Sequence, residues 1–484
     1  MKVRITLVHW RSGLPAVVVA LVAAPALAQP ARPPAPKQPP KPAAAAPAAP
    51  DDMAAFEHDL DTLFAAGGLT SDQAAARAGN ASATVRRKVA ELDAAIAQAD
   101  AAALARVPQV SAKATYTRLS PIDPVNLGFG GMNFQITSLQ NAYLAEGQLV
   151  VPLSDYVLRF PALIHAARLG ADAARIDKRA SEVTAGQDAR LAYYEWVRAR
   201  LQVLISKRQL VQVQKTLDQV RALAEVQRLS KADLLRVESQ EAEAEQVVDQ
   251  LENLSRLREE QLRLLIGAPA GEPLAIGEDI RADVAPPTAA QLDELVGAAR
   301  QRRLEFQAID TGIQAKESLR AAETANLLPR LSAFAVADYA DPNQRVFPQQ
   351  DKFKLTWQVG AQLTWTLNDA LVSRTTSRRL TAEASELRAD RDNLERGTRI
   401  ELLAAQQAVA IAEHALATSQ KGLTAAEEGY RVRKELLNAE RATAVELVDA
   451  ETDLTRARIT ALNARVDLRV ARAQLEHALG NDTK

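Results

Sequence analysis

Two carboxylates at the start of the last long helical segment are spaced so that they could act together. Glu446 and Asp449 are three residues apart, so a helix places both on one face. Paired carboxylates can serve as general acid and base, as in glycoside hydrolysis. Acids at this spacing are more often solvated, and the chain offers no nucleophile–base pair, phosphate-binding loop or metal-ligand spacing. We therefore expect no catalytic residue, no metal site, no cofactor and no enzyme activity.

The composition excludes further classes of protein. The 484 residues carry 59 basic and 60 acidic side chains, which leaves no basic excess for binding nucleic acid. The absence of cysteine excludes disulfides, thiolate metal sites, a cysteine nucleophile and a lipid-modified N-terminal cysteine. The five scattered histidines, which give little scope for a metal centre or general base, are His9, His58, His165, His414 and His477.

The two acids belong to a predicted helix over 443–479 that has two apolar seams. With Leu447 at heptad position a, every d position from Ala450 to Ala478 is alanine. A second seam of valine, threonine, isoleucine and leucine lies about 200° away around the helix. This helix is therefore expected to have neighbours on both flanks, like a stave in a wall, and the small alanines allow a close approach.

Two polar faces remain between these seams. One face holds Glu446, Asp449, Asp453, Arg456, Thr460, Asn463 and Asp467. The other holds Glu451, Arg458, Arg465 and Arg472. If such staves close into a tube, one face lines the interior and the other meets the surrounding water, although an ordinary solvated helix surface is the commoner source of charge runs. The residues alone do not decide which face is inside.

The start of the chain has the features of a cleaved secretory signal. Basic residues precede a short apolar run that ends in Ala26-Leu27-Ala28, so residues 1–28 are expected to be removed. A membrane anchor is the alternative, but about 14 apolar residues interrupted by proline are too short to span a bilayer comfortably. Residues 29–50 are rich in proline and alanine, and we expect them to form an extended tether.

Proline then disappears from two long stretches, between Pro161 and Pro269 and after Pro348. Both are rich in helix-forming residues, and helices approaching 65 residues would be about 100 Å long. Such lengths are typical of coiled-coil-like assemblies. The predicted helices are 69–106, 157–225, 231–266, 291–327, 370–438 and 443–479.

The chain contains two copies of one unit, which is its strongest organisational signal. For example, Val107-Pro108-Gln109-Val110-Ser111 corresponds to Leu328-Pro329-Arg330-Leu331-Ser332, and the separation of matching segments is about 213 to 221 residues. The resulting division is an N-terminal segment 51–68, a first repeat 69–267, a linker 268–289, a second repeat 290–480 and a C-terminal tail 481–484.

Within each repeat the hydrophobic period changes to that of a strand. Residues 354–367 alternate without a break, and Trp357 and Trp365 lie on the apolar face. On a strand tilted by about 45° the two rings are about 19 Å apart in height, a fair match to the aromatic girdles of a membrane barrel. A sheet packed on a soluble core is the alternative, but the rest of the chain is helical and offers no apolar partner. The other expected strands are 108–118, 143–151 and 329–339.

Four strands cannot close a barrel in lipid. About eight strands is the working minimum, and open sheet edges are not tolerated within a membrane. The subunit must therefore share its barrel with copies of itself. The turn-rich segments 119–140 and 340–352 are expected to be loops on the outer side.

In the order of its elements, the sequence resembles the TolC-type outer-membrane efflux channel family (the outer membrane factors). The stretches that carry the resemblance are 104–110, 148–155, 364–369 and 443–451, with Leu-Gly endings near 267 and 480. The resemblance implies a mainly α-helical trimer with a membrane β-barrel part: a 12-strand outer-membrane β-barrel continuous with a 12-helix periplasmic α-barrel. Each subunit would contribute four strands and long helices by internal duplication, and 51–68 and 268–289 would be equatorial.

The resemblance also implies a function. The protein would be a channel-tunnel in the outer membrane of a Gram-negative bacterium, extending into the periplasm, which exports small molecules or proteins in a tripartite efflux or type I secretion system. Its partners would be two further copies of itself, a periplasmic adaptor (membrane fusion) protein, an inner-membrane RND or ABC pump and outer-membrane lipid, with no nucleic acid. A periplasmic coiled-coil structural or adaptor protein is the alternative, but it leaves the strand alternation and the spaced tryptophans unexplained.

The resemblance assigns residues to the periplasmic entrance at the tips of the two helix hairpins. Glu446 and Asp449 match the acidic pair that rings the closed entrance, and Asp233 matches a carboxylate of the gate network. This match assigns the acidic face of the last helix to the lumen. Arg228 and Arg441 are candidates for the same gate network. The tip residues expected to contact an adaptor are Gln227, Leu229, Ser230, Glu440 and Thr443.

The sequence departs from the family at both tips. Gln227 and Glu440 stand where the family has a tip glycine. Leu437 and Ala442 occupy the usual positions of the gate tyrosine and arginine. The hydrogen bonds that lock the entrance are therefore expected to differ in this chain.

Overall fold

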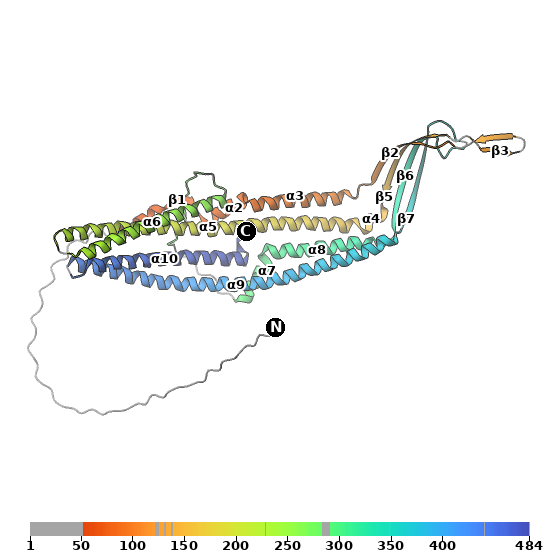
Figure 1. The fold of residues 1–484 in the computed structure, drawn as a ribbon. Helices are drawn as coiled ribbons and strands as arrows, with labels where there is room; N and C mark the ends of the chain where they lie inside the picture. Colours follow the sequence, from red (N-terminus) through yellow and green to blue (C-terminus); the bar gives the residue numbers. More distant parts are fainter. Residues whose placement is uncertain are drawn as a thin grey trace, which may run out of the picture. The chain divides into compact units, whose positions relative to one another are not determined.

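The computed structural model describes residues 52–121, 125–129, 132–136, 139–227, 229–282, 291–347, 349–439 and 441–483. Residues 1–51, where the signal and tether are predicted, lie outside the described residues. The unit that starts at Asp52 is mainly helical, and its helices run alongside one another with the strands at one end (Figure 1).

The elements of the first half are α1 (Asp52–Leu63), β1 (Phe64–Leu69), α2 (Ser71–Ala81), α3 (Ala83–Leu104), β2 (Gln109–Arg118), β3 (Val125–Phe129), β4 (Met132–Ile136), β5 (Asn141–Val151), α4 (Leu153–Leu158), α5 (Phe160–Glu225) and α6 (Lys231–Ile266). Those of the second half are α7 (Leu292–Arg302), α8 (Leu304–Ala325), β6 (Arg330–Asp341), β7 (Lys354–Thr364), α9 (Leu367–Asn438), α10 (Ala444–Leu479) and the 3-10 turn η1 (Asn481–Thr483).

The internal duplication predicted from the sequence is visible in the ends of α6 and α10. Each helix has 36 residues and begins after a hydroxyl N-cap, where Ser230 and Thr443 accept hydrogen bonds from backbone N–H groups three residues on. Each also ends at a left-handed glycine, Gly267 with φ 66° and Gly480 with φ 71°. The same start and stop signals therefore fix both helices.

The predicted helices over 69–106 and 291–327 are each interrupted once. Ser82 separates α2 from α3, and Arg303 separates α7 from α8; both residues have an extended backbone, with ψ near 130°. The two breaks lie at equivalent positions of the two repeats. The first break follows from the poor helix formers before Ser82. The second break places the Arg303 guanidinium 3.1 Å from the carboxylate of Glu305 and 2.6 Å from that of Glu401.

The long helices pack side by side in a wall. On the side of the middle nearer the sheet, the order across the wall is α3, α5, α8 and α9, and on the other side it is α6, α5, α10 and α9. The two hairpins α5–α6 and α9–α10 turn at the end opposite the sheet (Figure 1). Each long helix therefore has neighbours on both flanks except α9, α3 and α6, which form the edges.

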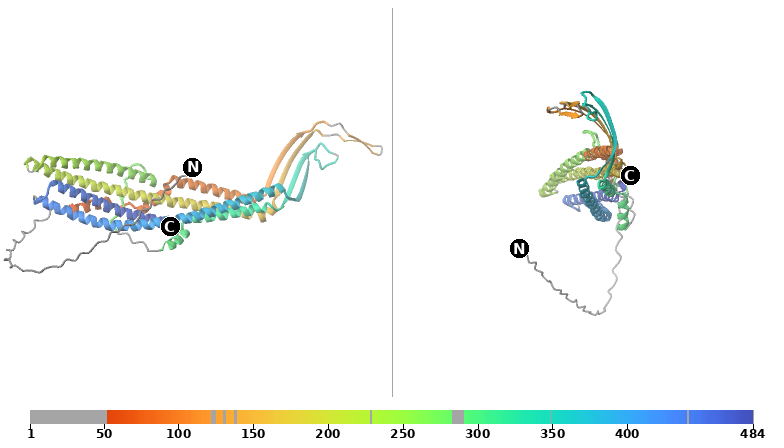
Figure 2. Two further views of the ribbon diagram at one scale, coloured as in Figure 1. Left: turned by 60° about the horizontal axis from the view of Figure 1, so that its bottom comes forward. Right: turned by 90° about the vertical axis from the view of Figure 1, so that its right-hand side faces the viewer.

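The four predicted strands form one antiparallel sheet in the order β2-β5-β6-β7. They leave the helices at the same end, and Figure 2 shows the sheet as a curved surface. The expectation of a simple loop over 119–140 is wrong, because β3 and β4 form a separate hairpin there. The alternating sequence around Gly130-Gly131 is a hairpin signal that favours this pairing.

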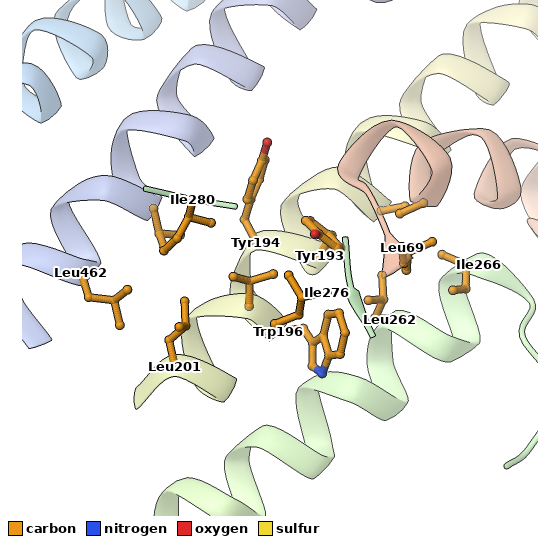
Figure 3. Close-up of a cluster of buried hydrophobic side chains, with 14 of the residues drawn as sticks. Leu69, Tyr193, Tyr194, Trp196, Leu201, Leu262, Ile266, Ile276, Ile280 and Leu462 are labelled. Carbon is orange, nitrogen blue, oxygen red and sulfur yellow. The ribbon is translucent and has the colours of Figure 1, made fainter. Parts of the chain in front are cut away.

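The largest apolar core lies at the middle of the wall, called the equator here. Trp196 and Tyr193 of α5 are fully buried among residues of α6, α10 and the segments that cross the wall (Figure 3). One crossing is β1, in which Leu69 donates a backbone hydrogen bond to Ala275 and accepts one from Gly277, at 2.8 and 2.9 Å. The N-terminal segment is thereby tied to the chain between the two repeats.

Replacing Gly277 by alanine is expected to destabilise the equator. A Cβ at Gly277 would lie 2.2 Å from the carbonyl oxygen of Gly68, and one at Gly68 would lie 2.7 Å from the nitrogen of Gly277. The two backbones would have to separate, at a cost of about 1–3 kcal/mol in the free energy of unfolding. Thermal unfolding followed by circular dichroism measures this loss.

Gly170 provides the control for this substitution. It lies within α5, and an added Cβ would meet nothing within 4 Å. Gly170→Ala should therefore raise the free energy of unfolding by roughly 0.5–1 kcal/mol through helix propensity. If Gly277→Ala were as stable as the wild type, the close approach of the backbones at Gly277 and Gly68 would be contradicted.

Candidate functional site

One face of the sheet is apolar across all four strands. Directly paired residues lie on the same face of a sheet, and the register places Val110, Leu149, Ala335 and Val359 side by side. Val110 is 80% exposed and Val359 is 68% exposed. The face comprises Val110, Ala112, Ala114, Tyr116, Tyr143, Ala145, Gly147, Leu149, Val151, Leu331, Ala333, Ala335, Ala337, Tyr339, Leu355, Trp357, Val359, Ala361 and Leu363. We call this set the apolar wall.

A row of aromatic rings crosses the sheet at the far end of the apolar wall. Ring centroids are 5.0 Å apart for Tyr116 and Tyr143, 6.0 Å for Tyr143 and Phe353, and 5.0 Å for Tyr339 and Phe353. The expected girdle residue Trp357 is 69% exposed and lies beside this row on the same face. The sequence analysis missed the row because its members come from different strands, and only the register brings them together.

The second expected girdle residue marks the other end of the apolar wall. Trp365 directly follows β7, is 58% exposed, and donates from its indole Nε1 to the carbonyl oxygen of Leu327 at 3.3 Å. From the level of Tyr339 to Trp365 the strand covers about 23 Å in height at a tilt of ~45°. This height is close to the ~25 Å apolar band of membrane barrels.

The opposite face of the sheet is mainly polar. β7 presents Thr356, Gln358, Gln362 and Thr364 there, and β2 presents Ser111, Lys113 and Thr115. At one position Phe334 is paired with Gly360, and a Cβ at Gly360 would lie 2.7 Å from the Phe334 ring. The ring therefore covers the glycine, and the sheet has one face suited to lipid and one suited to water.

The two hairpin tips lie side by side at the other end of the wall. A cavity of about 400 Å³ between them is lined by Leu223, Leu229, Ser230, Asp233, Leu437, Ala442, Thr443 and Ala444. Beneath it, Leu217 and Val220 of α5 and Val237 of α6 pack against Ala444 and Val448 of α10. Of the tip and gate residues that the sequence analysis selected, Leu229, Ser230, Asp233 and Thr443 line this cavity, and Arg228 and Glu440 lie outside the described residues.

Gln227 has the backbone conformation that a glycine would adopt without cost. Its φ is 58°, in the left-handed region. This is the position at which the resemblance implies a tip glycine, and the left-handed backbone here is one that glycine favours. Holding a glutamine there costs about 1 kcal/mol.

The three expected gate carboxylates occupy different surroundings. Asp233 is half-buried and accepts a hydrogen bond from the Ser230 hydroxyl at 2.7 Å, within its own hairpin. Glu446 is exposed, and its backbone N–H is capped by Thr443 at 3.2 Å. Arg441 is also exposed, and its backbone N–H donates to the carbonyl oxygen of Leu436 at 2.8 Å.

Asp449 joins the two hairpins through a residue that sequence reasoning missed. Its carboxylate lies 3.6 Å from the guanidinium of Arg236, one turn along α6 from Asp233. Both side chains are more than half exposed, so this ion pair contributes little to stability. It does place a cation beside the acidic pair. No pattern within α6 distinguishes Arg236 from other arginines, because its partner belongs to the other repeat.

The acidic face of α10 is exposed along its length, as a pore-lining face requires. Near the tips it borders a groove of about 680 Å³ between α6 and α10, with Glu243, Asp453 and Arg456 among its lining residues. Toward the equator the face is linked to α5, since Asp467 pairs with Arg198 at 2.5 Å and Asn463 accepts from Gln202 at 3.0 Å.

The other polar face of α10 is largely covered, which limits the expectation that it meets the surrounding water. Glu451 is 3% exposed, and its carboxylate accepts from the Thr216 hydroxyl at 3.1 Å and from Gln212 at 3.4 Å. Gln212 also donates to the Tyr430 hydroxyl at 2.9 Å. Because α5 and α9 approach each other over this side of α10, they enclose the charged residues between them.

The basic members of that face are also covered by α9. Arg472 pairs with Glu413 of α9 at 2.9 Å, and its side chain is 13% exposed. Arg458 and Arg465 are half-buried and line a small cavity with Gln420 of α9. The contacts of this face therefore hold α10 against α9 within the second hairpin.

A histidine near the C-terminal end of α10 makes stability depend on pH. The hydrogen bond that the His477 ring donates to the Asp482 carboxylate, with 2.7 Å between Nδ1 and Oδ2, raises the pKa of His477. Burial and the nearby Arg303 oppose this shift, and Glu401 supports it. The folded protein thus holds this proton more tightly than the unfolded chain.

We expect thermal stability to fall as the pH rises through the raised pKa of His477. The stabilisation is complete below the ordinary pKa of about 6.5 and is lost above the folded-state value. Unfolding midpoints measured between about pH 5.5 and 8.5 should decline in the wild type and decline less in His477→Gln. His414→Gln, at an exposed site on α9, should keep the wild-type slope. If the unfolding midpoints of all three proteins declined equally with pH, the His477–Asp482 pair would not be the cause of the pH dependence.

Among the residues that the structure describes, no helix combines the length and apolar composition needed to cross a membrane. Over the same residues, no group of three or more histidine, aspartate or glutamate side chains could hold a metal ion.

No protein-family model and no curated protein sequence matches the chain. Solved structures match its fold. CusC, described in connection with folding and transmembrane channel formation, has a TM-score of 0.71 and 15% identity, covering 86% of this chain and 93% of that one. The CmeC outer membrane channel of Campylobacter jejuni has a TM-score of 0.69 and 12% identity, covering 88% and 87%.

A third match is the open state of the MtrE outer membrane channel of Neisseria gonorrhoeae. Its TM-score is 0.69 at 16% identity, with 87% of this chain and 93% of that chain covered. At these identities the likeness is one of fold. The chain has the fold of the TolC-type outer-membrane channels, as the order of elements in its sequence predicts.

Proposed function

We propose that this protein is a trimeric outer-membrane channel whose helices form a periplasmic tunnel. The observation that carries the proposal is the apolar wall, which is exposed on a sheet with two unpaired edge strands. β2 and β7 are those edges. A lipid-facing sheet cannot keep open edges, so copies of the chain must pair β7 of one with β2 of the next. Three copies supply twelve strands, which exceeds the minimum of about eight.

The helical edges support the same assembly. On α9, Ile400 and Ile411 are 68% and 69% exposed, and on α6, Leu257 and Leu264 are 54% and 74% exposed. Both sets lie away from the subunit's own wall. Isolated exposed residues are normal, but repeated ones along both edges indicate a surface that another chain covers. Joining the edges would give the twelve-helix tunnel.

We assign the acidic face of α10 to the lumen. The other polar face is largely covered by α5 and α9, with Glu451 buried, so the acidic face is the more exposed of the two and the better suited to line a pore. At the tips, Glu446 and Asp449 would bring six carboxylates together in a trimer. Their combined negative field would concentrate cations and repel anions at the entrance.

The transport role follows from the fold and from the resemblance of the sequence. The similar structures include outer membrane channels of two Gram-negative genera. We infer export of small molecules or proteins through a tripartite efflux or type I secretion system, with a periplasmic adaptor docked at the hairpin tips and an inner-membrane RND or ABC pump below. The alternative, a periplasmic coiled-coil protein, would leave the exposed apolar wall unexplained.

The test is to isolate the mature protein and measure its assembly and conductance. We expect it in the outer-membrane fraction, extracted only by detergent, as a trimer by light scattering. In a planar bilayer it should form cation-selective pores of low resting conductance. A protein that is monomeric and water-soluble after signal removal would refute the proposal.

A further inference from the structure

One half-buried arginine of α10 has no ion-pair partner within the described subunit. Arg465 lies on the polar face that α9 largely covers, and it makes no ion pair or side-chain hydrogen bond with a described residue. One step of seven residues along the same face, Arg472 is paired with Glu413 of α9 at 2.9 Å. Moving a charged group partly out of water costs free energy unless another polar or charged group takes the place of the water. The surroundings of Arg465 therefore contain an unfilled requirement for an acceptor.

The missing partner follows from the sequence of α9. Because α9 and α10 run antiparallel in one hairpin, residues seven apart on one helix face residues seven apart on the other in reverse order. In the register of the Arg472–Glu413 pair, Arg465 stands opposite Gln420. The other steps set opposite charges against each other: Arg472 with Glu413, Arg458 with Glu427, and Glu451 with Lys434. We call this series the charge ladder. At one step it has a neutral amide in place of a carboxylate.

A small cavity lies at this step of the charge ladder. Its volume is about 110 Å³, and Arg465 and Gln420 both line it. The rest of the lining is mostly apolar and comes from α1, β1, α5, residues 280–281, α9 and α10. Three buried members of this lining, Leu201, Ile280 and Leu462, lie close together in Figure 3. The described lining includes no aspartate or glutamate, so the cavity combines an apolar interior with an excess of positive charge.

The other two arginines of the lining are already engaged. Arg281 pairs with Asp61 at 2.6 Å and with Asp279 at 2.9 Å, and its guanidinium lies 5.4 Å from the centre of the Phe64 ring. Arg458 is not free either, and it stands opposite a glutamate in the charge ladder. Within the described lining, Arg465 is therefore the arginine that remains for a bound anion.

We propose that this cavity binds a small carboxylate with a short apolar chain. The carboxylate would accept hydrogen bonds from the Arg465 guanidinium, whose planar fork matches its two oxygens. The chain would lie among Leu201, Ile205 and Leu423, where it removes apolar surface from water. Pockets for drug-sized ligands usually exceed about 300 Å³, so the volume restricts the ligand to a short chain. Hexanoate is the probe that we choose.

This site goes beyond the proposed function, because its described lining belongs to one subunit. It would connect parts of the chain that are distant in sequence, since α1 and α5 line one part of the cavity and α9 and α10 the other. A ligand that binds only the folded protein raises its stability by mass action. Hexanoate should therefore hold the second hairpin against the equator.

Thermal unfolding and calorimetric titration test the binding. The mature protein in neutral detergent is titrated with hexanoate at neutral pH, where the carboxylate is ionised. Hexanoate at millimolar concentrations should raise the unfolding temperature of the wild type. From propanoate to hexanoate, the affinity should rise by about fourfold for each added methylene group that is buried. Inorganic phosphate, which has no chain, and hexylammonium, which has the opposite charge, should leave the unfolding temperature unchanged.

Two substitutions remove the site in opposite ways. Arg465→Gln removes the guanidinium and should lower the affinity for hexanoate by about tenfold or more. Gln420→Glu keeps the arginine but completes the charge ladder, so the new carboxylate should compete with the ligand and lower its affinity by a similar factor. Gln420→Glu should also unfold at a higher temperature than the wild type without ligand. The control is Lys421→Gln, which removes an exposed positive charge beside Gln420 and should change the affinity by less than about twofold.

Each contrary result would overturn the proposal. If hexanoate did not raise the unfolding temperature of the wild type, Arg465 would have another counter-charge, such as a carboxylate of an adjacent copy. Equal protection by phosphate would show that the apolar lining takes no part in binding. Unchanged hexanoate affinity in both Arg465→Gln and Gln420→Glu would place the bound hexanoate elsewhere on the protein or in the detergent. A failure of trimer assembly or of conductance, by contrast, would count against the proposed channel and leave this binding site intact.

Discussion

Val359→Arg is expected to abolish assembly of the trimer in the outer membrane. Val359 lies near the middle of β7, in the centre of the apolar wall, and is 68% exposed in the subunit. An arginine on the lipid face of a barrel costs about 2–4 kcal/mol at the bilayer midplane. A trimer would carry three such residues, so the combined cost is a large fraction of ordinary folding stability. The amount of heat-modifiable trimer in purified outer membranes measures the effect.

A residue on the opposite face of the same strand gives a matched control. Gln362 is exposed on the mainly polar face of β7, where it is paired with Ser332. Gln362→Arg introduces the same side chain three positions away, and it should leave the yield of trimer near that of the wild type. If both variants assembled equally well, the apolar wall would not face lipid, and the proposal of a membrane barrel would fail.

Removing both entrance carboxylates, with Glu446→Gln and Asp449→Asn, should strongly reduce the preference for cations. Both side chains are exposed near the hairpin tips, and a trimer would lose six negative charges at its entrance. Charged clefts raise local counter-ion concentrations by factors of about 10–10³. The concentration of a polyvalent cation needed for half-block should therefore rise about tenfold or more. Reversal potentials and block in planar bilayers provide the measurements.

Asp467→Asn is the control for the entrance. Asp467 lies on the same face of α10, farther from the tips, and is already paired with Arg198. Its neutralisation should change the half-block concentration much less than the double substitution does. Unchanged selectivity in the double variant would place Glu446 and Asp449 outside the conduction path.

The architecture was largely predictable because it depends on local, repeated signals. Hydroxyl caps at Ser230 and Thr443 and terminal glycines at 267 and 480 are short-range features, and the structure confirms the helices that they bound. The alternation in β7 likewise predicted its apolar face, since side-chain direction in a strand has a period of two. The duplication strengthened each prediction by offering a second copy of the pattern.

The breaks in the helices and the enclosure of Glu451 were not predictable in the same way. Arg303 interrupts a helix where it meets Glu401, which is distant in sequence. Glu451 has an ordinary heptad position, and its burial depends on how closely α5 and α9 approach each other. Both features arise from packing between repeats, which periodicity within one helix does not encode.

The same contrast between local sequence signals and contacts between elements applies to the candidate site. The tip and gate residues were selected by resemblance, and four of the ten, Leu229, Ser230, Asp233 and Thr443, line one cavity. Arg236 and the aromatic row through Tyr143 were missed, because each depends on a partner from another element. The resemblance thus located the tips and sequence periodicity located the apolar wall, whereas the contacts between elements required coordinates.

The enclosed carboxylate of Glu451 has a consequence for the timing of channel events. Moving α10 away from α5 would strip the Thr216 and Gln212 donors from this group before water could replace them. Losing a donor to a buried polar group costs about 1–3 kcal/mol, and more when the group is charged. Three subunits moving together would multiply that barrier. If the protein forms the proposed channel, single-channel records should then show long closed dwell times broken by rare openings.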